Sequence, residues 1–158
     1  MATVPLTVRG VQKLRAELQQ LKGVERHAVI QAIAEARAQG DLSENAEYEA
    51  AKDKQGFIEG RILELESKLA AAQVIDPSTL DAGGRVVFGA TVDLEDQDKG
   101  ARVTYQIVGD DEADLKLGLI SISSPIARAL IGKEQGDVAD VQAPGGVKCY
   151  EIIDVRYR

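Results

Sequence analysis

The chain has 158 residues, of which 44% are hydrophobic and 28% charged, and its formal net charge is −7. This length allows one or two domains with a modest core. No apolar run approaches the roughly 20 residues that a membrane-spanning helix needs, so the sequence predicts no membrane span. A single cysteine, Cys149, excludes an internal disulfide, and the first residues do not read as a signal peptide. We therefore expect a reducing, cytoplasmic location.

The charge is unevenly distributed along the chain. Residues 1–75 contain 10 Lys or Arg against 11 Asp or Glu, and residues 76–158 contain 9 against 15. The acidic second half is a poor surface for bare nucleic acid, because nucleic acid binds cationic surfaces. In the first half, residues 9–37 contain six basic and three acidic side chains, whereas residues 38–51 contain four acidic and no basic ones.

Residues 1–75 predict an antiparallel hairpin of two long helices. Apolar residues recur at coiled-coil spacing in two stretches: Val11, Leu14, Leu18 and Leu21, and then Tyr48, Ala51, Gln55, Ile58, Ile62, Leu65 and Leu69. Leu18 opposite Leu65 and Leu21 opposite Ile62 share one register. Continued inward, this register puts Ala28, Ala32 and Glu35 on the seam and makes the chain reverse between Asp41 and Leu42.

The segment "QGDLSENAEYEA", residues 39–50, lies at this reversal. Gly40 is suited to end the first helix, and Asp41 with Glu44 forms a capping box for the second. That local role leaves Glu47 and Glu49 unexplained, because like charges this close destabilise a helix. Clustered carboxylates are also what Mg²⁺ requires, although so few acids need a partner to complete the site. The acids therefore indicate either the local structure of a turn or a role in binding Mg²⁺ together with a partner.

The second half predicts a small antiparallel sheet with one short helix, after a linker at residues 76–84. Strand-like runs cover residues 85–94, 102–108, 119–123, 138–143 and 147–157. Pro125 marks the start of a short helix that ends at Gly132, and residues 144–146 form a hairpin turn. The acidic segment "GDDEAD", residues 109–114, is interpreted as a solvated loop. The whole chain is thus expected to be a two-domain α+β protein.

Both halves resemble the bacterial GreA/GreB transcript cleavage factors. The similarity lies in "IAEARAQGDLSENAEYEAAKDKQGFIEGRI" and, in the same order, "GRVVFGATV", "YQIVGDDEAD", "ISISSPIARALIGKEQGD" and "PGG". It implies an N-terminal coiled-coil hairpin over residues 1–75 and an FKBP-like domain over residues 85–158. It also implies a monomer that docks on RNA polymerase through the second domain, with the hairpin in the secondary channel.

The resemblance further assigns roles to single residues. Asp41 and Glu44 would be the critical pair and would share a Mg²⁺ ion with the polymerase. The polymerase would then hydrolyse RNA whose 3′ end has backtracked. Glu47 would have a supporting role. Arg37 and Lys52 would contact this RNA, and Asn45 and Tyr48 would fix the shape of the tip. Docking on the polymerase would involve Ser123, Ser124 and Pro125.

Three other functions compete with this interpretation. A polymerase-binding inhibitor of the same architecture would not promote cleavage, and the intact Asp41 and Glu44 argue against it. A free-standing Mg²⁺ hydrolase would need a cleft and more ligands than a hairpin offers. A purely structural coiled-coil adaptor would explain the seams but not the unpaired acids. We therefore expect a factor that stimulates the polymerase and is not itself an enzyme.

Overall fold

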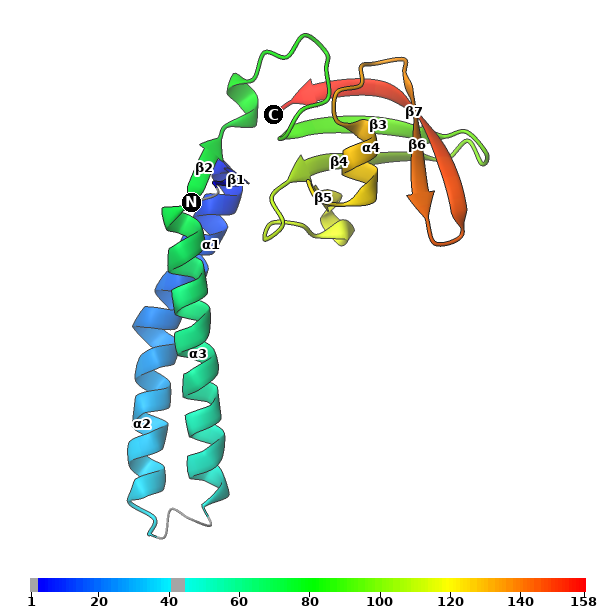
Figure 1. The fold of residues 1–158 in the computed structure, drawn as a ribbon. Helices are drawn as coiled ribbons and strands as arrows, with labels where there is room; N and C mark the ends of the chain where they lie inside the picture. Colours follow the sequence, from blue (N-terminus) through cyan, green and yellow to red (C-terminus); the bar gives the residue numbers. More distant parts are fainter. Residues whose placement is uncertain (1–2, 41–44) are drawn as a thin grey trace. The chain divides into compact units, whose positions relative to one another are not determined.

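The structure is a computed structural model that describes residues 3–40 and 45–158, and its chain divides into two compact units. One unit is Val11–Ala72, and the other combines Thr3–Gly10 with Gln73–Arg158. The first is a helical hairpin and the second is built on a β-sheet (Figure 1), which confirms the α+β fold. The contacts place residues 3–10 in the second unit, whereas the sequence analysis had included them in the hairpin.

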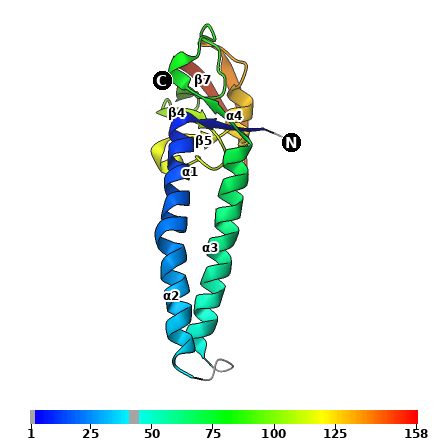
Figure 2. The ribbon, with the colours of Figure 1, turned by 90° about the vertical axis from the view of Figure 1, so that its left-hand side faces the viewer.

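The hairpin consists of two arms that lie side by side and run in opposite directions in both views (Figures 1 and 2). Its second arm is one continuous helix, α3 (Ala46–Ala70). Its first arm contains three consecutive helical segments: α1 (Val8–Gln20), a π-helical turn (Leu21–Glu25) and α2 (Arg26–Arg37).

The seam predicted for the second arm is confirmed. Its four buried residues are all predicted seam positions, namely Ala51, Ile58, Ile62 and Leu65. Its other three positions are half-buried, namely Tyr48, Gln55 and Leu69. Regular spacing over seven positions therefore identified the buried face of a 25-residue helix.

The seam predicted for the first arm is right up to Leu21 and wrong beyond it. Ala28, Ala32 and Glu35 are exposed, and the buried residues are instead Val29 and Ala36. The π-helical turn Leu21–Glu25 explains the shift, because it adds one residue to a helical turn and moves every later position by one. Val29 packs with Ile58 and Ile62 of α3 in a small core that Leu18 and Leu21 extend.

The core of the second unit lies between a five-stranded sheet and α4 (Pro125–Leu130). The strand order is β5-β4-β3-β7-β6; the β4–β5 pair is parallel and the other pairs are antiparallel. The strands are β3 (Ala90–Asp96), β4 (Arg102–Val108), β5 (Leu119–Ser121), β6 (Val138–Ala143) and β7 (Gly146–Tyr157). Val92, Leu94 and Ile107 from the sheet and Ala127 and Leu130 from α4 are buried in one cluster.

The predicted strands differ from this sheet at β5, which ends at Ser121 and not at residue 123, and at the start of the sheet, where residues 85–89 are not part of β3. Gly89 has a φ of 88°, which is a left-handed conformation that interrupts an extended strand. Val86 pairs instead with the loop after α4, and its amide donates to the Lys133 carbonyl at 2.8 Å. Its side chain is fully buried.

Two short strands, β1 (Val4–Thr7) and β2 (Ala72–Ile75), form a separate two-stranded sheet that the sequence analysis did not predict. Four residues are too few for an alternating pattern to stand out. Within the predicted linker, Asp76 caps a 3-10 turn at Pro77–Thr79 by accepting from the Ser78 amide at 3.0 Å. Among the helices of the described residues, none is long and apolar enough to cross a membrane.

Candidate functional site

The end of the hairpin begins where α2 stops. Hydrogen bonds from Ala38 and Gln39 to carbonyls of the preceding turn close the helix, and the Gly40 amide donates to the Arg37 carbonyl at 3.4 Å. Gly40 has a φ of 113°, which side-chain-bearing residues rarely adopt. The prediction that Gly40 ends the first arm is therefore confirmed.

Asn45 closes the other side of the tip through both ends of its side-chain amide. Its Oδ1 accepts from the Tyr48 amide at 3.0 Å, which makes it the N-cap of α3. Its Nδ2 donates to the carbonyl of Ala36, in α2, at 2.8 Å. One side chain thus caps the second arm and satisfies a carbonyl of the first, so the prediction that Asn45 fixes the shape of the tip is confirmed.

The predicted capping box is wrong, because α3 begins at Ala46 and its cap is Asn45. The sequence analysis had assigned that cap to Asp41, with Glu44 as its partner. Asn and Asp are about equally good N-caps, so the choice between Asp41 and Asn45 depended on where the helix starts. The residues themselves, Asp41 and Glu44, lie outside the described part of the chain.

The acidic residues on α3 are exposed. Glu47 and Glu49 lie in its first turn, where the helix dipole favours negative charge. Neither forms an ion pair with another residue of the described ranges, 3–40 and 45–158. A metal site formed by three or more His, Cys, Asp or Glu side chains is also absent from those ranges.

The acids further from the tip are paired across the hairpin. Arg61 donates to Glu17 at 2.6 and 3.1 Å, and Arg26 donates to Glu59 at 2.9 and 2.7 Å. The hydrogen bond from Arg61 holds the pKa of the Glu17 carboxyl below its usual range. The two arms are therefore charge-matched along their length, in contrast to Glu47 and Glu49.

Arg37 and Lys52 flank this end of the hairpin on its two arms. Arg37 is the last residue of α2, and Lys52 lies in the second turn of α3. Both side chains are exposed. Lys52 makes a long contact of 3.4 Å from its Nζ to the Gln55 Oε1, which leaves most of its hydrogen-bonding capacity to solvent.

The predicted docking residues form the turn between β5 and α4. Ser124 caps α4, since its Oγ accepts from the Ala127 amide at 3.3 Å, and Pro125 occupies the first turn. Ser123 is exposed and donates to the Asp110 carboxylate at 2.7 Å. Local structure thus accounts for Ser124, whereas Ser123 and Pro125 present exposed surface.

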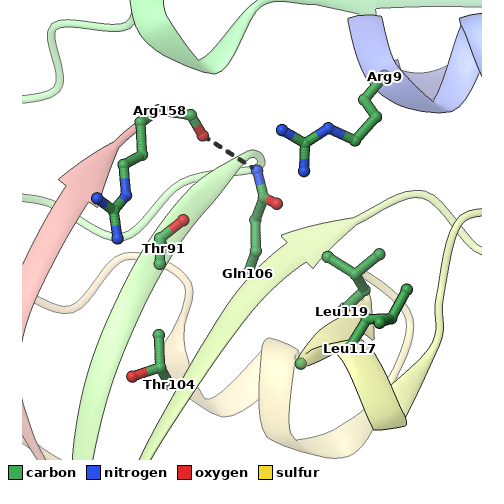
Figure 3. Close-up of a pocket in the computed structure, with 8 residues that line it drawn as sticks. Arg9, Thr91, Thr104, Gln106, Leu117, Leu119 and Arg158 are labelled. Carbon is green, nitrogen blue, oxygen red and sulfur yellow. Dashed lines mark hydrogen bonds between the residues drawn. The ribbon is translucent and has the colours of Figure 1, made fainter.

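The second unit contains a cavity of about 330 Å³ that was not predicted from the sequence. Figure 3 shows Gln106 between Arg158 and Arg9, with its Nε2 donating to the Arg158 carbonyl at 3.4 Å. Thr91 and Gln106 are paired in register across β3 and β4, as are Gln106 and Leu119 across β4 and β5. The lining consists of Arg9, Thr91, Thr104, Gln106, Leu117, Gly118, Leu119 and Arg158.

Two family models match almost the whole chain. Residues 4–74 match "Transcription elongation factor, N-terminal", and residues 81–157 match "Transcription elongation factor, GreA/GreB, C-term". The chain is 70% identical over 158 residues to transcription elongation factor GreA of Verminephrobacter eiseniae, with complete coverage of both chains. It is 73% identical over 157 residues to the GreA of Ralstonia nicotianae, covering 99% of each chain.

Among solved structures, the chain is similar to Gfh1 of Thermus aquaticus. The two are 30% identical, the match covers 99% of both chains, and the TM-score is 0.45.

Proposed function

Because the chain belongs to the GreA/GreB family of transcription elongation factors, we propose that it binds bacterial RNA polymerase and stimulates the polymerase to hydrolyse backtracked RNA. In this proposal the hairpin enters the secondary channel and brings its tip to the polymerase active centre. Cleavage then frees a short 3′ fragment and leaves a new RNA 3′ end for elongation. The chain acts as a cofactor of the polymerase and not as a nuclease itself.

The cap made by Asn45 is the observation that carries this proposal. Since Asn45 caps α3 and also binds α2, neither Asp41 nor Glu44 is needed to cap the second arm. The strongest structural explanation for these two acids is thereby removed. Acids that do not cap α3, and that lie in sequence between the two arms of a helical hairpin, are suited to be delivered to another protein.

Asp41 and Glu44 are proposed as the residues that act at the cleavage site. Mg²⁺ bound jointly with the polymerase would supply activation of the attacking water and stabilisation of the phosphate charge. Carboxylate oxygens are the ligands that this hard cation prefers, so the donor chemistry of the tip fits. Glu47, three residues after Glu44 in sequence, is exposed in the first turn of α3 and is proposed to support the pair.

Arg37 and Lys52 are proposed to contact the RNA. Both are exposed and flank the acidic tip, where a cation attracts the phosphate backbone. Two basic side chains form only a small patch, which suits a short extruded segment of RNA.

The turn between β5 and α4 is proposed to dock on the polymerase. Ser123 and Pro125 are exposed there, and Ser124 holds the turn in shape by donating to the Ser121 carbonyl at 2.6 Å. This placement separates docking, on the second unit, from chemistry, on the hairpin. We further propose that the chain acts as a monomer in the cytoplasm.

The main proposal is preferred to the inhibitor alternative, because relatives that are 70% and 73% identical to the chain are named transcription elongation factor GreA. A direct test uses purified elongation complexes that are halted and backtracked, with labelled RNA. We expect shortening of the RNA from its 3′ end only when complex and protein are both present with Mg²⁺. RNA cleavage by the protein alone, or none with both, would contradict the proposal.

A further inference from the structure

Glu112 is a buried carboxylate in a segment that the sequence predicted to be solvated. Its exposed fraction is 4%, although it lies in the acidic run at residues 109–114. A buried carboxylate is strongly unfavourable unless hydrogen bonds replace its water. The contacts of Glu112 therefore indicate what this residue holds in place.

All three hydrogen bonds to Glu112 come from uncharged groups. Its Oε2 accepts from the Gly109 amide at 2.7 Å and from the Thr7 amide at 3.1 Å. Its Oε1 accepts from the Thr7 hydroxyl. That hydroxyl in turn accepts from the Gly10 amide at 3.1 Å, inside the first turn of α1. We call these hydrogen bonds the Thr7–Glu112 latch, and all four residues that they join belong to the second unit.

Two glycines leave the space that the latch occupies. A Cβ on Gly10 would overlap the Glu112 carboxylate. A Cβ on Gly109 would lie 2.5 Å from the Pro5 carbonyl oxygen and 2.9 Å from the Glu112 Oε2. The backbone thus approaches the carboxylate from both sides. The carboxylate also lies at the start of α1, where the helix dipole favours a negative charge.

The Thr7–Glu112 latch lies at the start of the long first arm of the hairpin. The helical first arm begins at Val8, directly after Thr7, and continues to Arg37. Thirty helical residues extend about 45 Å, so a rotation of about 10° at the first turn displaces the far end by about 8 Å. Misplacement by about 1 Å is enough to slow a catalysed reaction about a hundredfold.

We propose that Thr7 and Glu112 are positioning residues for transcript cleavage, because they fix the start of the arm that carries the acidic tip. This inference rests on the proposed function. It assigns a purpose to a buried carboxylate that is about 70 residues from the tip acids in sequence and makes no contact with substrate. Loosening the latch should leave docking intact and lower the rate of cleavage once the factor is bound.

The first test is the variant Thr7→Val, which removes the hydroxyl and keeps the shape. Its control is Thr7→Ser, which keeps the hydroxyl. We expect the maximal cleavage rate at saturating factor to fall about tenfold in Thr7→Val, with a half-saturating concentration within about twofold of wild type. Thr7→Ser should behave as wild type. A wild-type maximal rate in Thr7→Val, or a change confined to half-saturation, would overturn the proposal.

A second test needs no cleavage activity. Spin labels on Cys149, the only cysteine, and on a cysteine introduced by Ala50→Cys report the distance between the sheet and the second arm. We expect the distance distribution to broaden in Thr7→Val and to stay as in wild type in Thr7→Ser. An unchanged distance distribution in Thr7→Val overturns the latch, whatever the cleavage assay shows. Failure of wild type to stimulate cleavage in the first assay refutes the proposed function and leaves the distance measurement as the test of the latch.

Discussion

Replacing Asn45 with alanine should destabilise the hairpin, because this side chain makes one hydrogen bond to the start of α3 and one to the end of α2. Loss of an N-cap costs about 1 kcal/mol. The Nδ2 bond to the Ala36 carbonyl, 2.8 Å long, ends on a residue that is only 2% exposed. The Gln39 amide also donates to this carbonyl, at 3.2 Å, so the variant loses one of its two hydrogen bonds, which adds about 1 kcal/mol. We therefore expect the free energy of unfolding to fall by about 2 kcal/mol.

The measurement is urea unfolding followed by helical circular dichroism, with thermal melting as a second probe. For a unit of the size of this hairpin, a loss of about 2 kcal/mol lowers the melting temperature by roughly 10 °C. Asn45→Asp is the matched control, since it keeps the capping oxygen and loses only the donor to Ala36. It should lie between wild type and Asn45→Ala. A stability of Asn45→Ala within about 0.3 kcal/mol of wild type would refute the assignment of the cap.

Two further predictions concern the second unit. Arg156 and the Thr104 hydroxyl hydrogen-bond to Asp93 and lower the pKa of its carboxyl. This stability is present above the unfolded pKa of about 3.9 and is lost as pH falls through the folded pKa. Asp93→Asn should therefore lower the free energy of unfolding by about 1–2 kcal/mol at pH 7. In urea titrations this difference from wild type should shrink below about pH 4, and a difference that stays constant with pH would contradict the role of the Asp93 carboxylate. Gly10→Ala should lower the free energy of unfolding by at least about 2 kcal/mol, because the new Cβ overlaps Glu112. The control Gly56→Ala, in open space on α3, should raise it by about 0.5–1 kcal/mol. Equal melting temperatures of the two variants would contradict the packing of Gly10 against Glu112.

Spacing along the chain was sufficient where one regular pattern ran without interruption. The heptads of α3 predicted both the helix and its buried face, and the strand-like runs predicted the positions of β4, β6 and β7. The same reasoning failed in the first arm after Leu21, because a π-helical turn adds a residue. Val29, Ile33 and Ala36 continue the seam one position late, at spacings of four and three. That offset could be read from the sequence, but the turn that produces it depends on packing against α3.

The candidate site was less predictable than the fold. Residue types placed acids at the reversal of the hairpin, but they did not decide which residue caps α3. Asp41 and Asn45 have the same local preference, so the choice depended on where α3 starts, and the bond from Asn45 to Ala36, across the two arms, has no local signal. Glu112 was likewise assigned to solvent because its neighbours are acidic. Its partner Thr7 is 105 residues away in sequence, beyond the reach of any local pattern.

The central claim is that the tip acids act in chemistry and not in folding, and the double variant Asp41→Ala with Glu44→Ala tests it most directly. Backtracked elongation complexes would be titrated with wild type and variant, with polymerase binding and thermal melting measured on the same samples. We expect the variant to lose stimulated cleavage but to bind like wild type and to melt within about 2 °C of wild type, because Asn45 keeps the cap. Undiminished cleavage by a variant that binds and melts like wild type would contradict it.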